Sequence, residues 1–201
     1  MAALLALALV MLKLTTVRPP VVPELPVISQ VSNFTLTNQL GQPVTLENLK
    51  GRIWVADIIF TRCAGPCPVM THHLRELQDA LPATSAAQLV TLTTDADADT
   101  PPVLLKYAEK FGANPKHWNF LTGDKRVIAN LAMDSLKLTA VAKKPEERTD
   151  DADLFVHSTI FVVVDKQGRL RGSFQTQGEM VEWPESKQQI LATIKKLESE
   201  P

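Results

Sequence analysis

The sequence predicts an α/β protein in which a central mixed β-sheet is flanked by helices. Short apolar runs typical of strands alternate with longer segments whose apolar residues recur at helical spacing, and paired strand patterns occur near both ends of the domain. With 201 residues, of which 45% are hydrophobic, the chain has room for one domain of about 150 to 170 residues and a tail.

The N-terminal part differs in composition from the rest. Residues 1–17 contain the apolar run Ala2–Leu12, which is shorter than the roughly 20 apolar residues of a spanning helix and has no basic flank before it. We interpret residues 1–17 as a hydrophobic anchor or signal segment, and favour an anchor because no Ala-x-Ala-like cleavage site follows. Residues 18–30 form a Pro-rich linker, which leaves residues 31–201 as the domain.

The domain begins with a predicted β-hairpin. Residues 34–37 and 43–46 have strand patterns on either side of a turn at residues 39–42. The run Ile53–Phe60 is nearly all apolar, which predicts a central strand buried on both faces. Apolar residues at helical spacing then predict a helix over Val69–Leu81.

A second strand and helix follow this unit. Gln88–Thr93 predicts the strand, and the turn Asp95–Asp99 after it contains three aspartates. These resemble a calcium loop, but the EF-hand glycine and terminal glutamate are missing, so we expect a solvated turn. Thr100 is the expected N-cap of a helix that ends at Gly112.

The C-terminal third completes the pattern. Residues 118–123 precede a predicted helix that is capped by Asp124 and runs through Met133. Ser158–Asp165 and Leu170–Phe174 predict a second hairpin, and Pro184–Leu197 predicts the last helix. This order of elements is the thioredoxin-like arrangement with an N-terminal β-hairpin.

Charge limits the classes of partner. The 21 basic and 22 acidic residues give a net charge of −1, without the basic excess of a nucleic-acid-binding protein or a basic stripe for anionic lipid. We therefore expect proteins or small ions as partners, and no nucleic acid.

The two cysteines of the chain, Cys63 and Cys67, lie directly after the predicted central strand. The first turn of the following helix offers unpaired N–H groups and a positive dipole end, which lower the pKa of a nearby thiol. A thiolate both attacks disulfides and binds metal, so the pair predicts a redox-active dithiol or a soft metal site. A structural disulfide or two inert core thiols are the alternatives.

Several motifs together are similar to those of one family. They are Phe60-Thr61-x-Cys63-x-x-x-Cys67-Pro68, Asp99-Thr100-Pro101 followed by Tyr107 and Phe111-Gly112, Leu121-Thr122-Gly123, and Val156-His157-Ser158 before an apolar strand. Over about residues 30 to 197 the chain resembles the Sco/SenC family of thioredoxin-fold copper proteins. It departs from the family pattern at Ala64, where a proline is usual, and at Val156, where an acidic residue is usual.

The resemblance implies a copper-binding metallochaperone that delivers copper to the binuclear copper centre of cytochrome c oxidase and assists its assembly. It implies Cys63, Cys67 and His157 as ligands of a copper ion, Cu(I) or Cu(II), and a copper-acceptor protein, cytochrome c oxidase subunit II, as partner. It also implies a membrane anchor with the domain on the extracytoplasmic side, in the bacterial periplasm or cell surface, or in the mitochondrial intermembrane space.

The residues support His157 independently. It precedes the apolar run Thr159–Val164, and in thioredoxin-like folds the loop before that strand packs over the cysteine pair. Thiolates suit Cu(I) and imidazole suits Cu(II), so the set can hold both oxidation states, although zinc accepts the same donors with a water. A hydrogen-bonded strand-end histidine is the alternative.

Other candidate residues have simpler explanations. His72 and His73 could be auxiliary ligands or a transfer relay, but we favour surface histidines. Met70 belongs to the apolar stripe of its helix. Asp57 is either a buried proton acceptor or a residue that faces solvent or caps a neighbour, and the charged stretch Lys143–Asp153 is expected to be a solvated loop that could help dock a partner.

Two functions therefore stay open. The first is the metallochaperone, which is not an enzyme. The second is a thiol-disulfide oxidoreductase in which Cys63 attacks a disulfide of the copper-acceptor protein and Cys67 resolves it. A chaperone needs His157 as a ligand, whereas a dithiol reductase tolerates its loss. A peroxiredoxin-like peroxidase is disfavoured because it needs a lone peroxidatic thiol in a different loop pattern.

Overall fold

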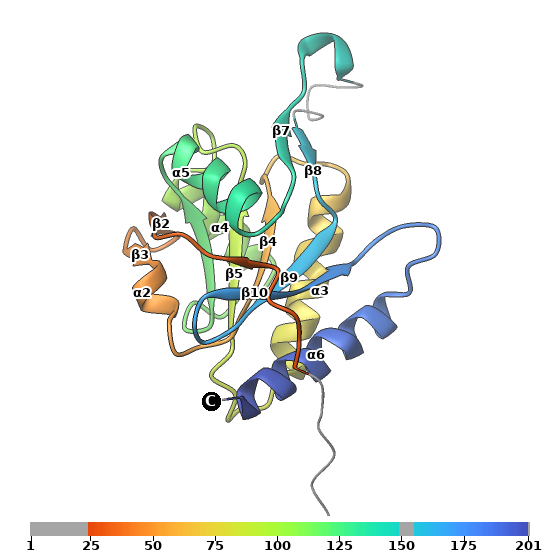
Figure 1. The fold of residues 1–201 in the computed structure, drawn as a ribbon. Helices are drawn as coiled ribbons and strands as arrows, with labels where there is room; N and C mark the ends of the chain where they lie inside the picture. The colour runs from red at the N-terminus through yellow and green to blue at the C-terminus, as the bar shows by residue number, and fades with distance from the viewer. Residues whose placement is uncertain (1–23, 149–154, 201) are drawn as a thin grey trace, which may run out of the picture.

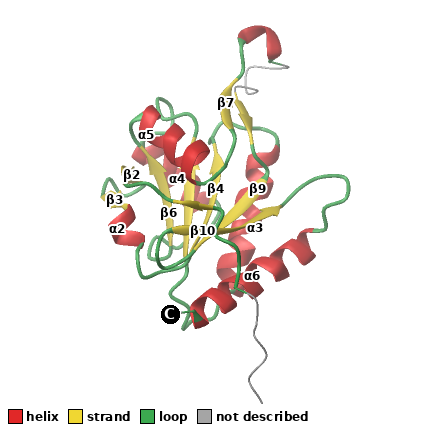
Figure 2. Ribbon diagram, viewed as in Figure 1, coloured by secondary structure: helices red, strands yellow, loops and turns green. Residues whose placement is uncertain are grey.

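The computed structural model describes residues 24–148 and 155–200, and its centre is an eight-stranded mixed sheet with the strand order β1-β10-β9-β4-β5-β6-β2-β3 (Figure 1). The central strands β4 (Trp54–Ile59), β5 (Gln88–Thr93) and β6 (Trp118–Thr122) run parallel. Helices cover both faces of the sheet (Figure 2). The predicted α/β class and mixed central sheet are confirmed.

Antiparallel strands extend the sheet on both sides. β9 (Ile160–Val164) pairs with β4, β10 (Arg169–Gln175) pairs with β9, and the short β1 (Ser29–Gln30) closes that edge. On the other side β2 (Thr35–Asn38) pairs with β6 and with β3 (Pro43–Thr45). The last pair is the N-terminal hairpin that the sequence predicts.

Three helices cover one face of the sheet: α3 (Pro66–Ala80), α4 (Pro101–Lys110) and α6 (Trp183–Ser199). Their apolar residues share one cluster with the facing side chains of the sheet. The fully buried members of this cluster include Cys67, Met70, Leu74, Leu77, Trp118, Phe120, Phe161 and Ile190. One of the two cysteines is thus part of the core.

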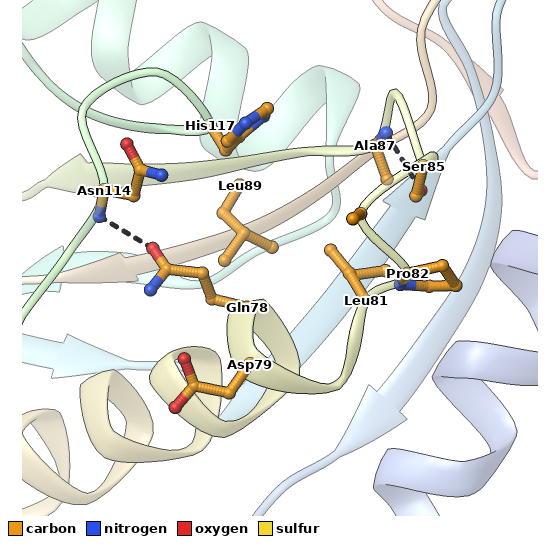
Figure 3. Close-up of a pocket in the computed structure, with 10 residues that line it drawn as sticks. Gln78, Asp79, Leu81, Pro82, Ser85, Ala87, Leu89, Asn114 and His117 are labelled. Atoms are coloured by element: carbon orange, nitrogen blue, oxygen red, sulfur yellow. Dashed lines mark hydrogen bonds between the residues drawn. The ribbon is translucent and has the colours of Figure 1, made fainter.

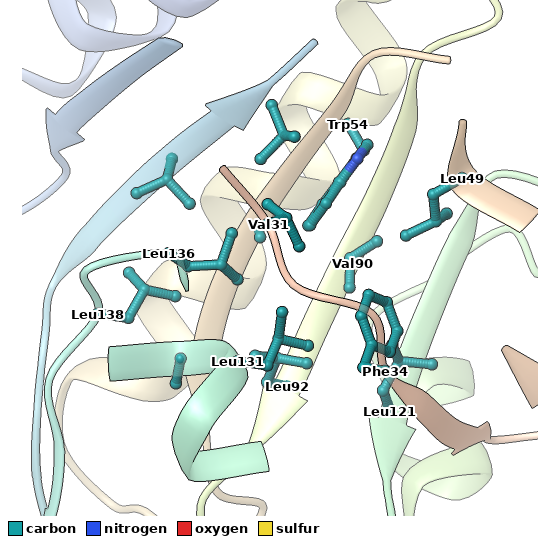
Figure 4. Packing of buried hydrophobic residues seen from close by; sticks show 14 of the residues in the cluster. Val31, Phe34, Leu49, Trp54, Val90, Leu92, Leu121, Leu131, Leu136 and Leu138 are labelled. Carbon is teal, nitrogen blue, oxygen red and sulfur yellow. The ribbon is translucent and has the colours of Figure 1, made fainter. Parts of the chain in front are cut away.

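The other face is covered by α2 (Leu46–Leu49), α5 (Lys125–Ala129) and the π-helix η1 (Asn130–Ser135). Figure 4 shows buried side chains of this cluster, among them Val31, Trp54 and Val90, packed over this face of the sheet. The helix that the sequence predicts from Asp124 through Met133 is divided into α5 and the π-helix η1. Asp124 caps the first as expected, since its carboxylate accepts hydrogen bonds from the first backbone amides of α5.

One further element boundary differs from the sequence prediction, and one predicted N-cap is confirmed. Helix α3 begins at Pro66 rather than at Val69, because proline is well suited to the first helical position, and Cys67 is therefore inside the helix. Thr100 is the N-cap of α4 as predicted, although its carbonyl oxygen rather than its side chain closes the first turn, by accepting a 2.9 Å hydrogen bond from the Leu104 amide.

A two-stranded ribbon was missed by the sequence reasoning. β7 (Ala140–Ala142) pairs with β8 (Phe155–His157), and the 3-10 helix η2 (Pro145–Glu147) lies between them. The stretch Lys143–Asp153 was expected to be a solvated loop, and its residues 149–153 lie outside the described residues. The many charged residues between the two short strands are typical of a loop, so the sequence did not indicate that these strands pair.

The predicted anchor, residues 1–17, lies outside the described residues, as do residues 18–23 of the predicted linker. Within residues 24–148 and 155–200, the structure has no helix that is both long enough and apolar enough to cross a membrane.

A buried arginine joins the two ends of the described chain to the sheet. The Nη1 atom of Arg171 lies 2.8 Å from a carboxylate oxygen of Asp165 and 2.8 Å from one of Glu200. The same guanidinium donates to the carbonyl oxygen of Leu25 at 2.6 Å and to that of Pro26 at 3.2 Å. Arg171 thereby holds the N-terminal segment that contains Leu25 and Pro26 beside the last turn of α6.

Candidate metal centre

The two cysteines meet where β4 ends and α3 begins. The Cys63 amide donates to the carbonyl oxygen of Phe60 at 3.2 Å, which closes a tight turn after the strand, and Gly65 is the N-cap of α3. Cys63 is half-buried and Cys67 is buried, and both are thiols rather than a disulfide. A hydrogen bond joins the two thiols.

The environment of Cys67 contradicts one expectation. The hydrogen bond with the Cys63 thiol and burial raise the pKa of Cys67, while a hydrogen bond with the Phe60 backbone acts in the opposite direction. The predicted lowering of the pKa by the helix start is therefore wrong for Cys67. The side chain is fully buried, and removal from water disfavours the charged thiolate more than the start of the helix favours it.

Polar side chains from α3, α4 and β4 surround Cys67 within the core. The Thr71 hydroxyl donates to the carbonyl oxygen of Cys67 at 2.9 Å, and its oxygen lies 2.9 Å from the Tyr107 hydroxyl. Burial raises the pKa of Tyr107, and the hydrogen bond with Thr71 acts against it. Asp57 on β4 is fully buried, so the solvent-facing alternative is wrong, and its charge contributes to the raised pKa of Cys67.

The acidic turn after β5 holds the cysteine loop. Asp99 is fully buried and accepts hydrogen bonds from the backbone amide of Thr61, at 3.1 Å, and from the Thr61 hydroxyl. Asp95 accepts two hydrogen bonds from Arg62, the shorter at 2.5 Å. The solvated-turn prediction is wrong for these two aspartates.

The sequence did contain a signal for this contact. Strands β4 and β5 are adjacent and parallel, so the turns at their carboxyl ends meet at one edge of the sheet. Asp97 in the same turn behaves as expected, because its side chain is 77% exposed and pairs with Lys125.

The backbone of His157 lies at the same end of the sheet as the cysteine loop. It is the last residue of β8 and pairs with Ala140. β9 runs antiparallel to β4, so the segment that leads from His157 into β9 lies at the end of the sheet where β4 leads into the cysteine loop. Figure 1 shows the β7–β8 ribbon rising from the end of the sheet where α3 begins. The side chain of His157 lies outside what the structure describes.

The remaining candidate residues of α3 have structural roles. Met70 is fully buried, which confirms its place in the core. His72 is a surface residue as expected, with its Nε2 atom 3.6 Å from a carboxylate oxygen of Glu76. His73 is half-buried rather than fully at the surface, because its ring stacks on Trp183 of α6 with centroids 4.0 Å apart, and burial lowers the pKa of His73.

No three His, Cys, Asp or Glu side chains are grouped as a metal site among those that the structure describes. The cysteine pair supplies two donors of one soft type. A three-ligand site at this position would need a donor beyond those side chains, and the backbone of His157 lies at the same end of the sheet as the cysteine pair.

A pocket of about 340 Å³ lies at the far end of α3 (Figure 3). Gln78 lines it and accepts a 2.7 Å hydrogen bond from the Asn114 amide. Gln78 lies eleven positions after Cys67 in the sequence, which is about 16 Å along the helix axis. This pocket is therefore separate from the thiol pair.

Comparison with known proteins gives consistent results. The sequence profile of the SCO1/SenC family matches residues 26–197. The chain is 37% identical to the SCO1 protein homolog of Bacillus subtilis over 147 residues, which cover 72% of this chain and 73% of that protein. It is 31% identical over 144 residues to a Stutzerimonas stutzeri protein whose name proposes copper binding, covering 71% of this chain and 67% of that one.

Solved structures give the same answer. The chain resembles the structure of BsSco, which is described for a disulfide switch and as a member of the Sco family of cytochrome c oxidase assembly proteins. The two are 31% identical with a TM-score of 0.73, over 89% of this chain and 99% of the other. This likeness confirms the predicted thioredoxin-like fold.

Proposed function

Because the chain belongs to the SCO1/SenC family, we propose that it is a copper-binding metallochaperone that serves assembly of the binuclear copper centre of cytochrome c oxidase. One observation carries this proposal: two thiols in hydrogen-bond contact stand where a buried strand ends and a helix begins. Two soft donors held in contact by the fold can bind one ion with little rearrangement.

We assign Cys63, Cys67 and His157 as the ligands. Two thiolates and one imidazole form a donor set that suits copper in either oxidation state. The proposal for His157 is supported by the position of its backbone, which lies at the end of the sheet where β4 leads into the cysteine loop. A metal ion takes the place of the thiol protons on binding, since only the thiolate is a ligand.

The two cysteines have different roles in this proposal. Cys67 is fully buried within the first turn of α3 and keeps its place during transfer. Cys63 is half-buried in a loop whose residues Ala64 and Gly65 are exposed, so an incoming donor from another protein reaches its sulfur first. Copper is therefore handed over by ligand exchange that begins at Cys63.

The acceptor that fits this chemistry is cytochrome c oxidase subunit II. The kinship with BsSco, a member of a family of cytochrome c oxidase assembly proteins, supports it. The apolar run in residues 1–17 supports a membrane anchor. The likeness to a SCO1/SenC family lipoprotein from Bacillus anthracis supports placing the domain on the extracytoplasmic side of the membrane.

A second function, thiol-disulfide oxidoreductase, is favoured by the thiol–thiol contact, because two thiols in hydrogen-bond contact need only a short approach of their sulfurs to form a disulfide. The Cys63 thiolate would attack a disulfide of the acceptor and form a mixed disulfide. Cys67 would then attack the Cys63 sulfur, which releases the acceptor as a dithiol and leaves a Cys63–Cys67 disulfide. Two electrons thus pass to the acceptor. The raised pKa of Cys67 suits the resolving rather than the attacking role.

A transfer experiment distinguishes the two functions. The full chain loaded with one equivalent of Cu(I) is mixed anaerobically with the copper-free soluble domain of a cytochrome c oxidase subunit II whose cysteines are reduced. We expect copper to move to the acceptor while Cys63 and Cys67 remain thiols, as measured by metal analysis and thiol labelling after separation. Retention of copper by the chain, or failure to load it, would contradict the chaperone. Oxidation of the pair by a disulfide-containing acceptor would support the reductase.

A further inference from the structure

We propose that Asp99 is a positioning residue of the thiol site, whose buried carboxylate fixes the turn before Cys63 and thereby the place of the Cys63 sulfur relative to Cys67. The proposal rests on the function proposed above and identifies what organises that site. Asp99 touches neither cysteine in this account and acts through Thr61.

The turn itself shows why an outside support matters. The hydrogen bond from the Cys63 amide to the Phe60 carbonyl makes Thr61 and Arg62 the two central residues of a four-residue turn. Both central residues are held by carboxylates of one neighbouring loop, Thr61 by Asp99 and Arg62 by Asp95. Cys63 is the last residue of this turn, so the orientation of the turn sets the direction of its side chain.

Asp99 is also tied to the sheet. Its carboxylate accepts a hydrogen bond from the hydroxyl of Thr93, the last residue of β5, and its amide donates to the Asp95 carbonyl at 2.8 Å. Thr93 in turn accepts a 3.0 Å hydrogen bond from the Asp95 amide. A buried carboxylate is costly unless it is well hydrogen-bonded, and here three donors satisfy it. The carboxylate therefore links a rigid strand end to the cysteine loop.

The two cysteines obtain their positions from different sources. Cys67 is fixed by α3, and the Gln177 side chain adds a 3.1 Å hydrogen bond to the carbonyl oxygen of Pro66. Cys63 lies outside the helix, next to the exposed Ala64 and Gly65. The hydrogen bonds from Thr61 to Asp99 fix the position of Cys63, as α3 fixes the position of Cys67. Outer contacts of this kind orient the ligands of a metal site.

The test compares three variants of the full chain with wild type. Asp99→Asn keeps the shape of the side chain, but its amide has only one acceptor oxygen for three donors. Thr61→Val removes the hydroxyl that links the loop to Asp99. Asp97→Asn is the matched control, because Asp97 lies in the same turn with an exposed side chain. Cu(I) affinity is measured by competition with a chelator, and the dithiol–disulfide equilibrium is measured against glutathione.

We expect Asp99→Asn to weaken Cu(I) binding by about 10- to 100-fold and to shift the dithiol–disulfide equilibrium about tenfold toward the dithiol, because a looser turn lowers the effective concentration of one thiol at the other. Thr61→Val moves both readouts in the same direction, and Asp97→Asn leaves both within about twofold of wild type. Thermal unfolding, followed separately, shows that the measured protein is folded.

Two results would overturn the proposal. One is a pair of folded variants, Asp99→Asn and Thr61→Val, that unfold at lower temperature but match wild type in both readouts. The other is an equal effect of Asp97→Asn. If Asp99→Asn does not fold, Thr61→Val decides alone. If wild type itself binds no copper, the proposed function fails, and the dithiol–disulfide equilibrium still tests the role of Asp99.

Discussion

Replacement of Cys67 by serine is expected to weaken Cu(I) binding by more than about 100-fold. This loss is larger than the loss on removing a residue that only orients a metal ligand. A serine hydroxyl is a hard, neutral donor in place of a soft thiolate, and Cu(I) binds it poorly. Cys67 is fully buried at the start of α3, so the substitution removes one of the two soft donors without moving the helix. The affinity is measured by competition with a Cu(I) chelator under anaerobic conditions.

The matched control removes the other sulfur near the start of this helix. Met70→Leu keeps the volume of a fully buried core side chain, and we expect it to leave Cu(I) affinity within about twofold of wild type. A Cys67→Ser protein that retains Cu(I) within tenfold of wild type would contradict the assignment. An equal loss in Met70→Leu would show that the thioether, and not the thiol pair alone, binds the ion.

Replacement of Arg171 by methionine is expected to lower the free energy of unfolding by about 3 to 5 kcal/mol. Methionine fills the space of the arginine stem but leaves the buried carboxylate of Asp165 without one of its partners and the carbonyls of Leu25 and Pro26 without their donor. The side chains of Arg171 and Asp165 are only 2% and 3% exposed, so water does not replace the contact between them. Denaturant unfolding at pH 7 measures the difference.

An exposed ion pair is the control for Arg171. Lys50→Met removes the pair with Glu47, whose side chains are 45% and 77% exposed, and we expect a change below about 1 kcal/mol. Equal effects of the two substitutions would contradict the account of the buried cluster. Copper affinity of the folded Arg171→Met protein is expected to match wild type, because Arg171 contacts no residue of the cysteine loop in the described hydrogen bonds.

The effect of Arg171→Met also depends on pH. Burial raises the pKa of Asp165, but hydrogen bonds from Arg171 and Arg169 outweigh burial, and the pKa lies below its usual value. A carboxylate with a depressed pKa stabilises the fold above its unfolded pKa of about 3.9 and loses this contribution as the pH falls through the folded pKa. The difference between wild type and variant is thus full at pH 7 and shrinks below about pH 4.

The sequence predicted the elements whose signals are local. Ile53–Phe60 is apolar throughout because both faces of β4 are covered, and Gln88–Thr93 coincides with β5 for the same reason. The ribbon β7–β8 was missed because each of its strands has three residues, and the charged stretch between them resembles a loop. The π-helix η1 was missed because its apolar residues follow nearly the same spacing as an α-helix.

The sequence also predicted only the part of the candidate site whose signal is local. The cysteine pair is contiguous in sequence, so its meeting at a strand end and helix start could be inferred from spacing. The supports of the pair could not, since Asp99 is 38 residues from Thr61 and is identified only by the pairing of β4 with β5. The pKa direction of Cys67 depends on burial and on the contact with Cys63, which no local pattern reports.

The measurement that tests the three-ligand site most directly is an anaerobic copper titration of the full chain and of His157→Ala, with His72→Ala as control because His72 is an exposed histidine of α3. Binding is followed by competition for Cu(I) and by the Cu(II)–thiolate absorption. We expect one tightly bound equivalent in wild type and in His72→Ala, and a markedly lower affinity with an altered absorption band in His157→Ala. Equal affinity and an unchanged band in His157→Ala would contradict the three-ligand site and favour a dithiol protein that acts by thiol–disulfide exchange.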